Sequence, residues 1–292
     1  MIKRSLGERI FNLCNIIFLT LLCVVTIYPL LYVVFASISD PMEFLKHTGI
    51  LLKPEGFSLI AYERVFAKKE IWSGYGNTLF YTVVGTLINM LLTITLGYGL
   101  SKKDLKLVKP ITLMIVFSMY FSGGMIPSYI LVKNLQLLDT RWAIILPGAI
   151  STFNLIIMRT AFENVPQSLE EAALIDGATH MYLLWKIIIP LTMPTIAVLI
   201  LYYASAHWNA WFNSAIYLRD TSKYPLQLYL RDILISDSQT DMVLASDSAE
   251  KLAVSSIIKY ATIIVATVPM LLVYPYLQKY FTKGVMVGAV KG

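Results

Sequence analysis

Long stretches without a charged residue recur along the chain. Six segments contain no Asp, Glu, Lys or Arg: 10–39, 71–101, 110–132, 142–158, 187–218 and 260–278. A membrane-spanning helix needs about 20 mostly apolar residues, and a helix satisfies its backbone hydrogen bonds within one such segment. The segments are too long and too uniformly apolar for the strands of a barrel. The pattern predicts an all-α membrane protein with six transmembrane helices.

The composition agrees with this prediction. The chain has 292 residues, of which 57% are hydrophobic and 14% are charged, whereas a soluble domain carries about 25% charged residues. The first apolar segment is longer than the core of a signal peptide and no clear cleavage site follows it, so we expect a retained helix. Cys14 and Cys23 both fall within that helix, where two cysteines cannot bond each other, and we expect them to be apolar fillers.

The distribution of basic residues predicts the orientation. Short loops decide membrane topology, and the short turn at 101–109, with the sequence SKKDLKLVK, is basic. The segments 40–70 and 219–259 are long and carry mixed charge, so we expect them outside the cell. Both termini are then cytoplasmic. The net charge of +6 reflects cytoplasmic flanks beside anionic lipid, and no nucleic-acid partner is implied.

Prolines and glycines interrupt two of the predicted helices. The sequence FSGGMIP at 121–127 falls within the third helix, and Pro147 falls within the fourth. Broken backbone at membrane depth is tolerated where it faces protein or a wet cavity. The interruption at 121–127 therefore has two interpretations, a segment that lines a pathway or a loose helix end.

The external segment 219–259 is polar and acidic towards its end. Its acidic residues there are Asp237, Asp241, Asp247 and Glu250. We expect a solvated loop, and the alternative is a docking site for an extracellular protein.

A short polar segment at 163–186 separates the fourth and fifth apolar stretches. Ser168 is a good N-cap, and Glu171 three residues later completes a capping box. Asp176 and Gly177 end the predicted helix, because glycine adopts the left-handed backbone conformation at no steric cost. A helix of about two turns is marginal in water, so we expect it to pack against something. On spacing alone, a turn lying against lipid headgroups is the favoured interpretation, because capping boxes are common.

The same segment resembles the EAA motif of binding-protein-dependent ABC importer permeases. The motif falls on Glu171-Ala172-Ala173, Gly177 and Ile187-Ile188-Ile189-Pro190, with Ile189 in place of the usual Leu. The resemblance implies a type I ABC importer permease fold, with a cytoplasmic coupling helix that docks in a groove of the ATPase subunit. The residues that it assigns to ATPase coupling are Glu171, Ala172, Ala173, Asp176 and Gly177.

Two further regions, 122–166 and 278–292, resemble the carbohydrate-uptake branch of the family, the maltose-type permeases. The resemblance covers nearly the whole chain and implies three parts: an N-terminal helix and external loop (1–70), the permease domain (71–283) and a cytoplasmic tail (284–292). In the maltose system the equivalent tail reaches into the ATPase dimer interface. Residues suited to such an extended, basic contact are Lys283, Gly284, Gly288, Lys291 and Gly292.

The partners follow from the resemblance and from what the chain lacks. No Gly-x-x-x-x-Gly-Lys-Ser/Thr sequence is present, so a separate protein must bind ATP and Mg²⁺. The family implies a second homologous permease, a cytoplasmic ATPase dimer, and an extracellular lipid-anchored binding protein that delivers an oligosaccharide, all at a bacterial cell membrane. We expect no cofactor, no metal and no enzyme activity in this chain; His47, His180 and His207 lie far apart in the sequence.

The end of the fifth apolar stretch is the candidate substrate path. Its sequence is AHWNAWFN at 206–213, and in importers of this type the fifth helix lines the pathway. A sugar offers apolar faces to the ring of Trp208 and hydroxyls to the amides of Asn209 and Asn213. The alternative is an aromatic belt at the membrane surface.

Three other functions remain open. The motif says nothing about cargo, so the chain is alternatively an ABC importer permease for a different polar solute. An ATP-independent channel or secondary carrier is disfavoured, because ion coupling needs an ionisable residue at membrane depth. A non-transporting scaffold is disfavoured by the interrupted helices.

Overall fold

A computed structural model describes residues 6–102, 106–243 and 249–289, and all regular secondary structure in those ranges is helical. The chain divides into two compact units. The first comprises Met1–Lys69 with Leu230–Val268, and the second comprises Glu70–Tyr229 with Pro269–Gly292.

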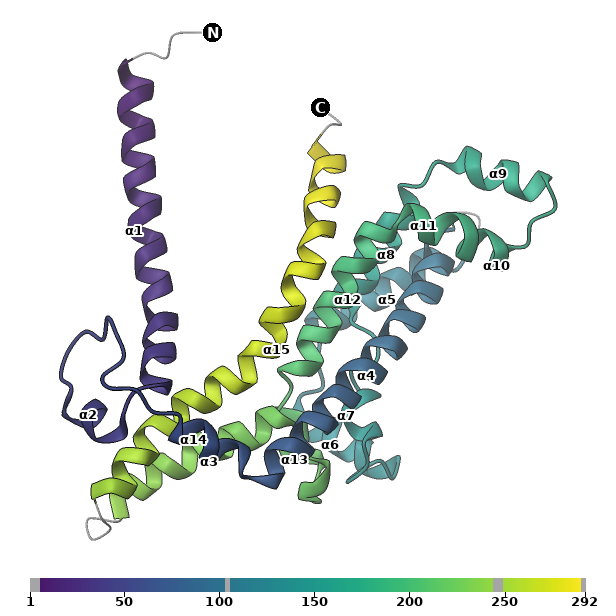
Figure 1. The fold of residues 1–292 in the computed structure, drawn as a ribbon. Coiled ribbons are helices and arrows are strands. Elements are labelled where there is room, and N and C mark those ends of the chain that lie inside the picture. The colour runs from purple at the N-terminus through teal and green to yellow at the C-terminus, as the bar shows by residue number, and fades with distance from the viewer. Residues whose placement is uncertain (1–5, 103–105, 244–248, 290–292) are drawn as a thin grey trace. The chain divides into compact units, whose positions relative to one another are not determined.

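The first unit holds the N-terminal helix and much of the predicted external regions. Its helices are α1 (Leu6–Ser37), α2 (Pro41–Lys46), α3 (Ile60–Phe66), most of α14 (Leu226–Val243) and the first half of α15 (Ala249–Ala289) (Figure 1). The loop predicted at 40–70 thus contains two short helices. Asp40 caps α2 by accepting hydrogen bonds from the backbone N–H groups of Met42 and Glu43, at 2.9 and 3.2 Å, and the hydroxyls of Ser37 and Tyr62 lie 2.8 Å apart.

The prediction of a loop at 219–259 was wrong over most of its length. α14 and the start of α15 are helical, so Asp237, Asp241 and Glu250 lie on helices, while Asp247 lies outside the described residues. Low apolar content and mixed charge are compatible with an exposed helix as well as with a loop, which is why composition alone did not separate the two.

The second unit holds the remaining elements. Its spans and long helices are α4 (Lys69–Ser101, which begins at the unit boundary), α5 (Val108–Tyr120), α6 (Met125–Asn134), α8 (Thr152–Glu163) and α12 (Met193–Trp208). Its short elements are α7 (Trp142–Ile145), α9 (Gln167–Ile175), α10 (His180–Leu183), the π-helix η1 (Leu184–Ile188), α11 (Ile189–Leu191), α13 (Phe212–Tyr217) and the 3₁₀ turn η2 (Thr221–Lys223).

Three helices among the described residues are long and apolar enough to cross a membrane. They are Gly7–Ser37, Lys69–Ser101 and Ala253–Leu272. Two bent pairs, α5 with α6 and α10–α11 with α12, raise the number to five if each pair forms one span; they bend by 117° and 85°. The six predicted spans are therefore not all present as continuous helices.

The fourth predicted span, 142–158, was wrong as a continuous helix. α7 ends at Ile145 and α8 begins only at Thr152. Pro147 has no backbone N–H to continue the helix, and Ser151 caps the new helix by accepting a hydrogen bond from the N–H of Asn154 at 3.4 Å. The proline was visible in the sequence, but its effect on the helix was underestimated.

The interruptions at the two bent pairs have local causes. α5 ends at Tyr120, and Gly124, the N-cap of α6, has φ +86°, a positive φ that favours glycine. Pro190 and Pro194 flank the second bend, where the hydroxyl of Thr192 donates to the carbonyl of Ile188 at 2.8 Å. The π-helix η1 ends at Ile188, two residues before Pro190, and adjusts the backbone there.

Polar side chains join α4 to α12 and to the α7–α8 connection. The amide of Asn89 lies 3.0 Å from Nε2 of His207 and donates to the carbonyl of Gly148 at 2.8 Å. The hydroxyl of Tyr203 lies 2.8 Å from that of Thr93 and accepts from the backbone N–H of residue 151 at 3.1 Å. His207 therefore has a structural partner, and the network holds the broken backbone of the fourth stretch in place.

Candidate functional site

The α9 helix begins earlier than the sequence suggested. It starts at Gln167, after Pro166, and Ser168 lies inside the helix instead of capping it. The predicted capping box was therefore wrong. Proline suits the start of a helix because its fixed φ is helical and its missing N–H is not needed there. Glu171 accepts a hydrogen bond from the amide of Gln167 at 2.8 Å, one turn earlier on the same helix.

The predicted end of α9 is confirmed. Asp176 is the C-cap, and Gly177 follows with φ +83°. The N–H of Gly177 donates to the carbonyl of Leu174 at 3.1 Å, and the N–H of Ala178 donates to that of Ala173 at 2.9 Å. These bonds satisfy the last carbonyls of the helix and reverse the chain towards α10.

The two alanines of the motif face different surroundings. Ala173 is 9% exposed and belongs to a buried cluster that includes Phe162 and Leu183. Ala172, together with Glu171 and Asp176, is exposed. The side chain of Ala173 thus attaches α9 to the helices beside it, and Ile188 of the same motif is also buried, whereas Glu171, Ala172, Asp176 and Gly177 lie on the accessible surface.

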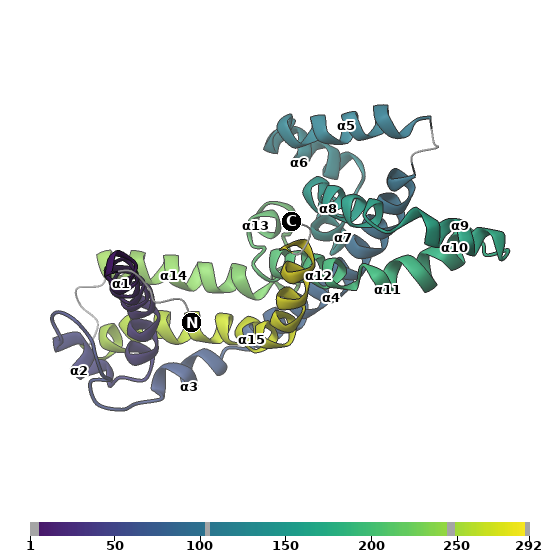
Figure 2. The same cartoon turned by 90° about the horizontal axis from the view of Figure 1, so that it is seen from above.

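Apolar side chains also lie on the accessible surface of α9. Ile175 is 85% exposed, and Leu169 and Leu174 are more than 40% exposed. Figures 1 and 2 show α9 and α10 at one end of the second unit, beyond the C-terminal end of α4. Exposed apolar residues on a short helix of this kind are typical of a surface that another protein covers.

An ion pair joins α9 to α4. Lys102, directly after α4, contacts the carboxylate of Glu170, and the two side chains are 20 and 19% exposed. The ammonium of Lys102 also lies 4.3 Å from the ring centroid of Tyr98. The hydroxyl of Tyr98 is 3.4 Å from Nδ1 of His180 on α10. The sequence did not predict these contacts, because they join residues far apart in the chain.

The candidate substrate-path residues differ in exposure. Trp208 is 7% exposed, and its ring lies 6.4 Å from that of Tyr75. Asn209 and Asn213 are exposed, and the amide of Asn209 donates to the carbonyl of Ser205 at 2.9 Å. Within this chain the two amides are accessible, and most of the Trp208 ring is covered.

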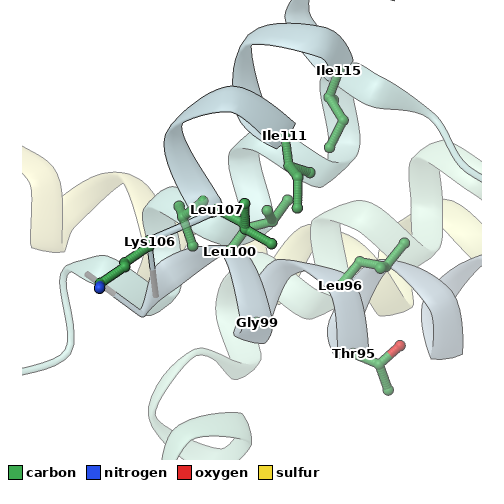
Figure 3. Close-up of a pocket in the computed structure, with 9 residues that line it drawn as sticks. Thr95, Leu96, Gly99, Leu100, Lys106, Leu107, Ile111 and Ile115 are labelled. Carbon is green, nitrogen blue, oxygen red and sulfur yellow. The ribbon is translucent and has the colours of Figure 1, made fainter. Parts of the chain in front are cut away.

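A groove between α4 and α5 has the wrong chemistry for a sugar. Its volume is about 720 Å³, and its walls are almost entirely apolar (Figure 3). Hydrogen-bonding side chains are needed to replace the water around sugar hydroxyls. The lining residues are Thr95, Leu96, Gly99, Leu100, Lys106, Leu107, Val108, Ile111 and Ile115.

The opposite end of the second unit is held together by a polar network. Asp139, with φ +58°, accepts hydrogen bonds from the backbone N–H groups of Arg219 and Asp220 at 3.1 and 3.0 Å. These N–H groups, with a contribution from the charge of Lys223, hold the pKa of Asp139 below its usual value. Asn77 donates to the carbonyls of Ser222 and Tyr224 at 2.7 and 3.1 Å. The network fixes the loops around α13.

The predicted C-terminal tail is helical as far as it is described. α15 continues to Ala289, where the sequence led us to expect an extended segment from Gly284 onwards. Lys291 and Gly292 lie outside the described residues.

Comparisons with known proteins agree with the arrangement of these elements. Residues 1–287 match the family of the binding-protein-dependent transport system inner membrane component. The polygalacturonan/rhamnogalacturonan transport system permease protein YtcP of Bacillus subtilis is 41% identical over 285 residues, covering 98% of this chain and 99% of that protein. Protein LplC of the same organism is 42% identical over 286 residues, covering 97 and 96%.

A solved structure gives the same fold. A chain in the crystal structure of a bacterial ABC transporter involved in the import of the acidic polysaccharide alginate superposes with a TM-score of 0.87 at 33% identity, covering 96% of this chain and 100% of that chain. The match extends over nearly the full length of both chains. This chain has the type I ABC importer permease fold and belongs to the family of binding-protein-dependent transport system inner membrane components, as a permease subunit whose ATPase is a separate protein.

Proposed function

We propose that this chain is the permease subunit of an ATP-driven importer that takes up an oligosaccharide delivered by an extracellular, lipid-anchored binding protein. It acts with a second, homologous permease and a cytoplasmic ATPase dimer, which binds ATP and Mg²⁺. Both termini are then on the cytoplasmic side of a bacterial membrane. The chain's own role is to form half of the path and to receive the movement of the ATPase.

The observation that carries the coupling role is α9 itself. It is a short helix with a buried attachment at Ala173 and an exposed surface that includes Glu171 and Ile175. An amphipathic helix that lays exposed apolar residues in a groove is a common recognition mode. Docking in an ATPase groove covers this surface, and ATP-driven closure then displaces the helix.

The relatives support an oligosaccharide cargo, and the absence of charged residues from the apolar stretches supports an energy source outside the membrane. YtcP is named for polygalacturonan and rhamnogalacturonan transport, and the transporter of similar fold imports alginate. The apolar stretches contain no Asp, Glu, Lys or Arg, and their one histidine, His207, lies beside Asn89. They therefore lack the acidic partner that a coupling ion usually needs, which supports an energy source outside the membrane. The amides of Asn209 and Asn213 are accessible hydrogen-bonding groups for sugar hydroxyls.

Two measurements test the proposal. Gentle purification of the tagged chain from its native membrane, followed by mass spectrometry, is expected to recover a P-loop ATPase, a second permease and a lipoprotein. The complex is then reconstituted in proteoliposomes. It is expected to import neutral or uronic-acid oligosaccharides only when ATP is enclosed in the lumen, where it reaches the ATPase of complexes that face inward. Recovery of the chain alone, or uptake that persists without ATP, contradicts the proposal in favour of a channel. Uptake of a different solute class with no oligosaccharide uptake contradicts the cargo alone.

A further inference from the structure

The α9 helix needs a mechanical connection to a spanning helix if its displacement is to change the membrane path. Its covalent neighbours are short connections, from Asn164 to Pro166 before it and from Gly177 to Thr179 after it. Coupling between distant elements is carried by packed side chains and ion pairs as well as by the chain itself. The contacts between α9 and other helices therefore help to determine which helix moves with it.

Lys102 and Glu170 supply such a contact between elements distant in the sequence. Lys102 follows the last residue of α4, and Glu170 lies in the first turn of α9. Both side chains are about four-fifths buried, so water and salt screen their attraction less than that of an exposed pair. The negative charge of Glu170 is also stabilised by the positive end of the α9 dipole.

Aromatic contacts hold Lys102 in place. Its ammonium lies over the ring of Tyr98, which meets the ring of Phe162 edge-on with centroids 6.4 Å apart. Tyr98 also approaches His180 on α10. The C-terminal end of α4 is thus in contact with α8, α9 and α10, and a cavity of about 180 Å³ is left beside the pair. The residues lining this cavity are Ser101, Lys102, Phe162, Glu163, Val165, Gln167 and Glu170.

α4 in turn is packed tightly against the helices of the bundle. A Cβ added at Gly97 would lie 3.1 Å from Cγ of Met158 on α8, and one added at Gly85 would lie 2.5 Å from the His207 ring on α12. Closely packed interfaces switch between discrete arrangements and do not deform continuously. A displacement of the end of α4 therefore reaches α8 and α12.

From these contacts we infer that Lys102 and Glu170 are positioning residues that tie the coupling helix to α4, so that α4 moves with α9 when the ATPase closes. The inference rests on the proposed function, because it presumes that α9 receives the movement of an ATPase. Neither residue belongs to the candidate substrate path. Their role is to keep ATP hydrolysis productive.

Charge reversal of each partner tests the pair. In the reconstituted complex, Lys102→Glu and Glu170→Lys are each expected to lower the number of sugars imported per ATP roughly fivefold or more, the lower end of common allosteric couplings. Lys102→Glu combined with Glu170→Lys is expected to recover most of that loss. The matched control is Lys109→Glu, the same charge change at an exposed lysine of the same basic segment, which is expected to leave the ratio unchanged. Wild-type ratios in both single variants, or no recovery in the double variant, overturn the inference.

A cross-link covers the case in which a reversed charge prevents assembly. Cys14 and Cys23 are first replaced by Ser, and Lys102→Cys is combined with Glu170→Cys. Before cross-linking we expect a low import-to-hydrolysis ratio, and a short bismaleimide between the two cysteines is expected to restore it. If α9 must slide along α4, the cross-linked complex will stay at the low ratio, and the inference is then wrong.

A readout that does not depend on cargo separates this inference from the proposed function. Thr95 is an exposed residue near the C-terminal end of α4. Thr95→Cys, in the same background, is labelled with an environment-sensitive fluorophore, and its emission is recorded with and without ATP. ATP is expected to change the emission when residues 102 and 170 are native and not when Lys102 is Glu. An ATP-dependent change without oligosaccharide import keeps the inference and contradicts the cargo. The same ATP-dependent change in the Lys102→Glu variant, or none in the native pair, overturns it.

Discussion

At one end of the second unit, around α13, the chain closes on itself through many hydrogen bonds, whereas at the other end α9 presents exposed apolar side chains. The α13 end places Asp139 and Gln136 in the left-handed region, a strained conformation for residues other than glycine. Asp139 offsets that strain with two backbone hydrogen bonds and a contact with Lys223. The α9 end relies on the Lys102–Glu170 ion pair and on Ala173.

The difference indicates different tasks. Most polar groups of the α13 network find partners within the chain, although the buried hydroxyl of Ser214 on α13 has none among the described residues. Paired networks of this kind make a region rigid. Ile175, at the α9 end, is 85% exposed. Its side chain leaves water only when another protein covers it. Substitutions at the α9 end are therefore expected to impair coupling more than stability, and substitutions at the α13 end are expected to do the reverse.

The largest effect is expected at Gly177. Gly177→Val is expected to abolish uptake, because a β-branched residue is strongly disfavoured at φ +83° and α9 then cannot end where it does. Uptake into cells is the measurement, and the amount of protein in the membrane shows whether insertion is intact. Gly177→Asn is the matched control, since Asn tolerates the left-handed region, and it is expected to keep most activity. Normal uptake by Gly177→Val would refute the coupling role of this turn.

Ile175 tests the exposed surface of α9. Ile175→Asp is expected to weaken ATPase binding roughly tenfold, because a charge replaces an apolar contact and about 1.4 kcal/mol corresponds to a factor of ten. The measurement is the amount of ATPase that co-purifies over a dilution series. Ile50→Asp makes the same change at a residue that is 71% exposed in the first unit and is expected to have no such effect. Equal ATPase recovery from both variants would remove α9 from the interface.

Asp139 tests the other end. Asp139→Ala removes the acceptor for two backbone N–H groups and places Ala at φ +58°, so we expect a lower melting temperature of the purified protein. ATPase recovery should not change. Asp139→Asn keeps an acceptor oxygen and a residue that tolerates this conformation, and should melt closer to the wild type. A loss of ATPase binding without a loss of stability would reverse the assignment of the two ends.

The smallest effect is a dependence of stability on pH at the α13 end. The pKa values of Asp139 and Asp220 are both lowered, that of Asp139 by the N–H groups of Asp220 and Arg219 and that of Asp220 by hydrogen bonds from Ser222. A carboxylate whose pKa is lowered by folding stabilises the fold above the usual Asp pKa, and the stabilisation disappears as pH falls through the lowered value. Melting temperatures between pH 7 and pH 3 should therefore fall less steeply in Asp139→Ala than in the wild type. Parallel curves would show that Asp139 does not contribute.

The exposure of the substrate-path residues shows where sequence reasoning stopped. Trp208, Asn209 and Asn213 were grouped because they are close in the sequence and chemically suited to a sugar. Trp208 is the last residue of α12 and packs near Tyr75, whereas the two asparagines are exposed. Adjacent residues at a helix end point in different directions, and only packing shows which of them is covered.

The sequence by itself determined that the helices lie in a membrane and where some of them break or end. The charge-free stretches required helices in a membrane. Gly123 and Gly124 predicted the break between α5 and α6, and Gly177 predicted the end of α9. These features depend only on local hydrophobicity or on local backbone conformation, so they can be predicted from the sequence. The predicted start of α9 was wrong, since Pro166 and Ser168 are both acceptable near a helix N-terminus.

Only the tertiary structure decided which distant residues meet. Lys102 and Glu170 are 68 positions apart, Asn89 and His207 are 118 apart, and no periodicity links either pair. The fourth apolar stretch was long enough to span, yet it is broken near Pro147, and hydrogen bonds from Asn89 and to Tyr203 satisfy the backbone at Gly148 and Ser151 there. The free energy of these contacts depends on burial and on the geometry between helices, and neither can be predicted from the order of the residues alone.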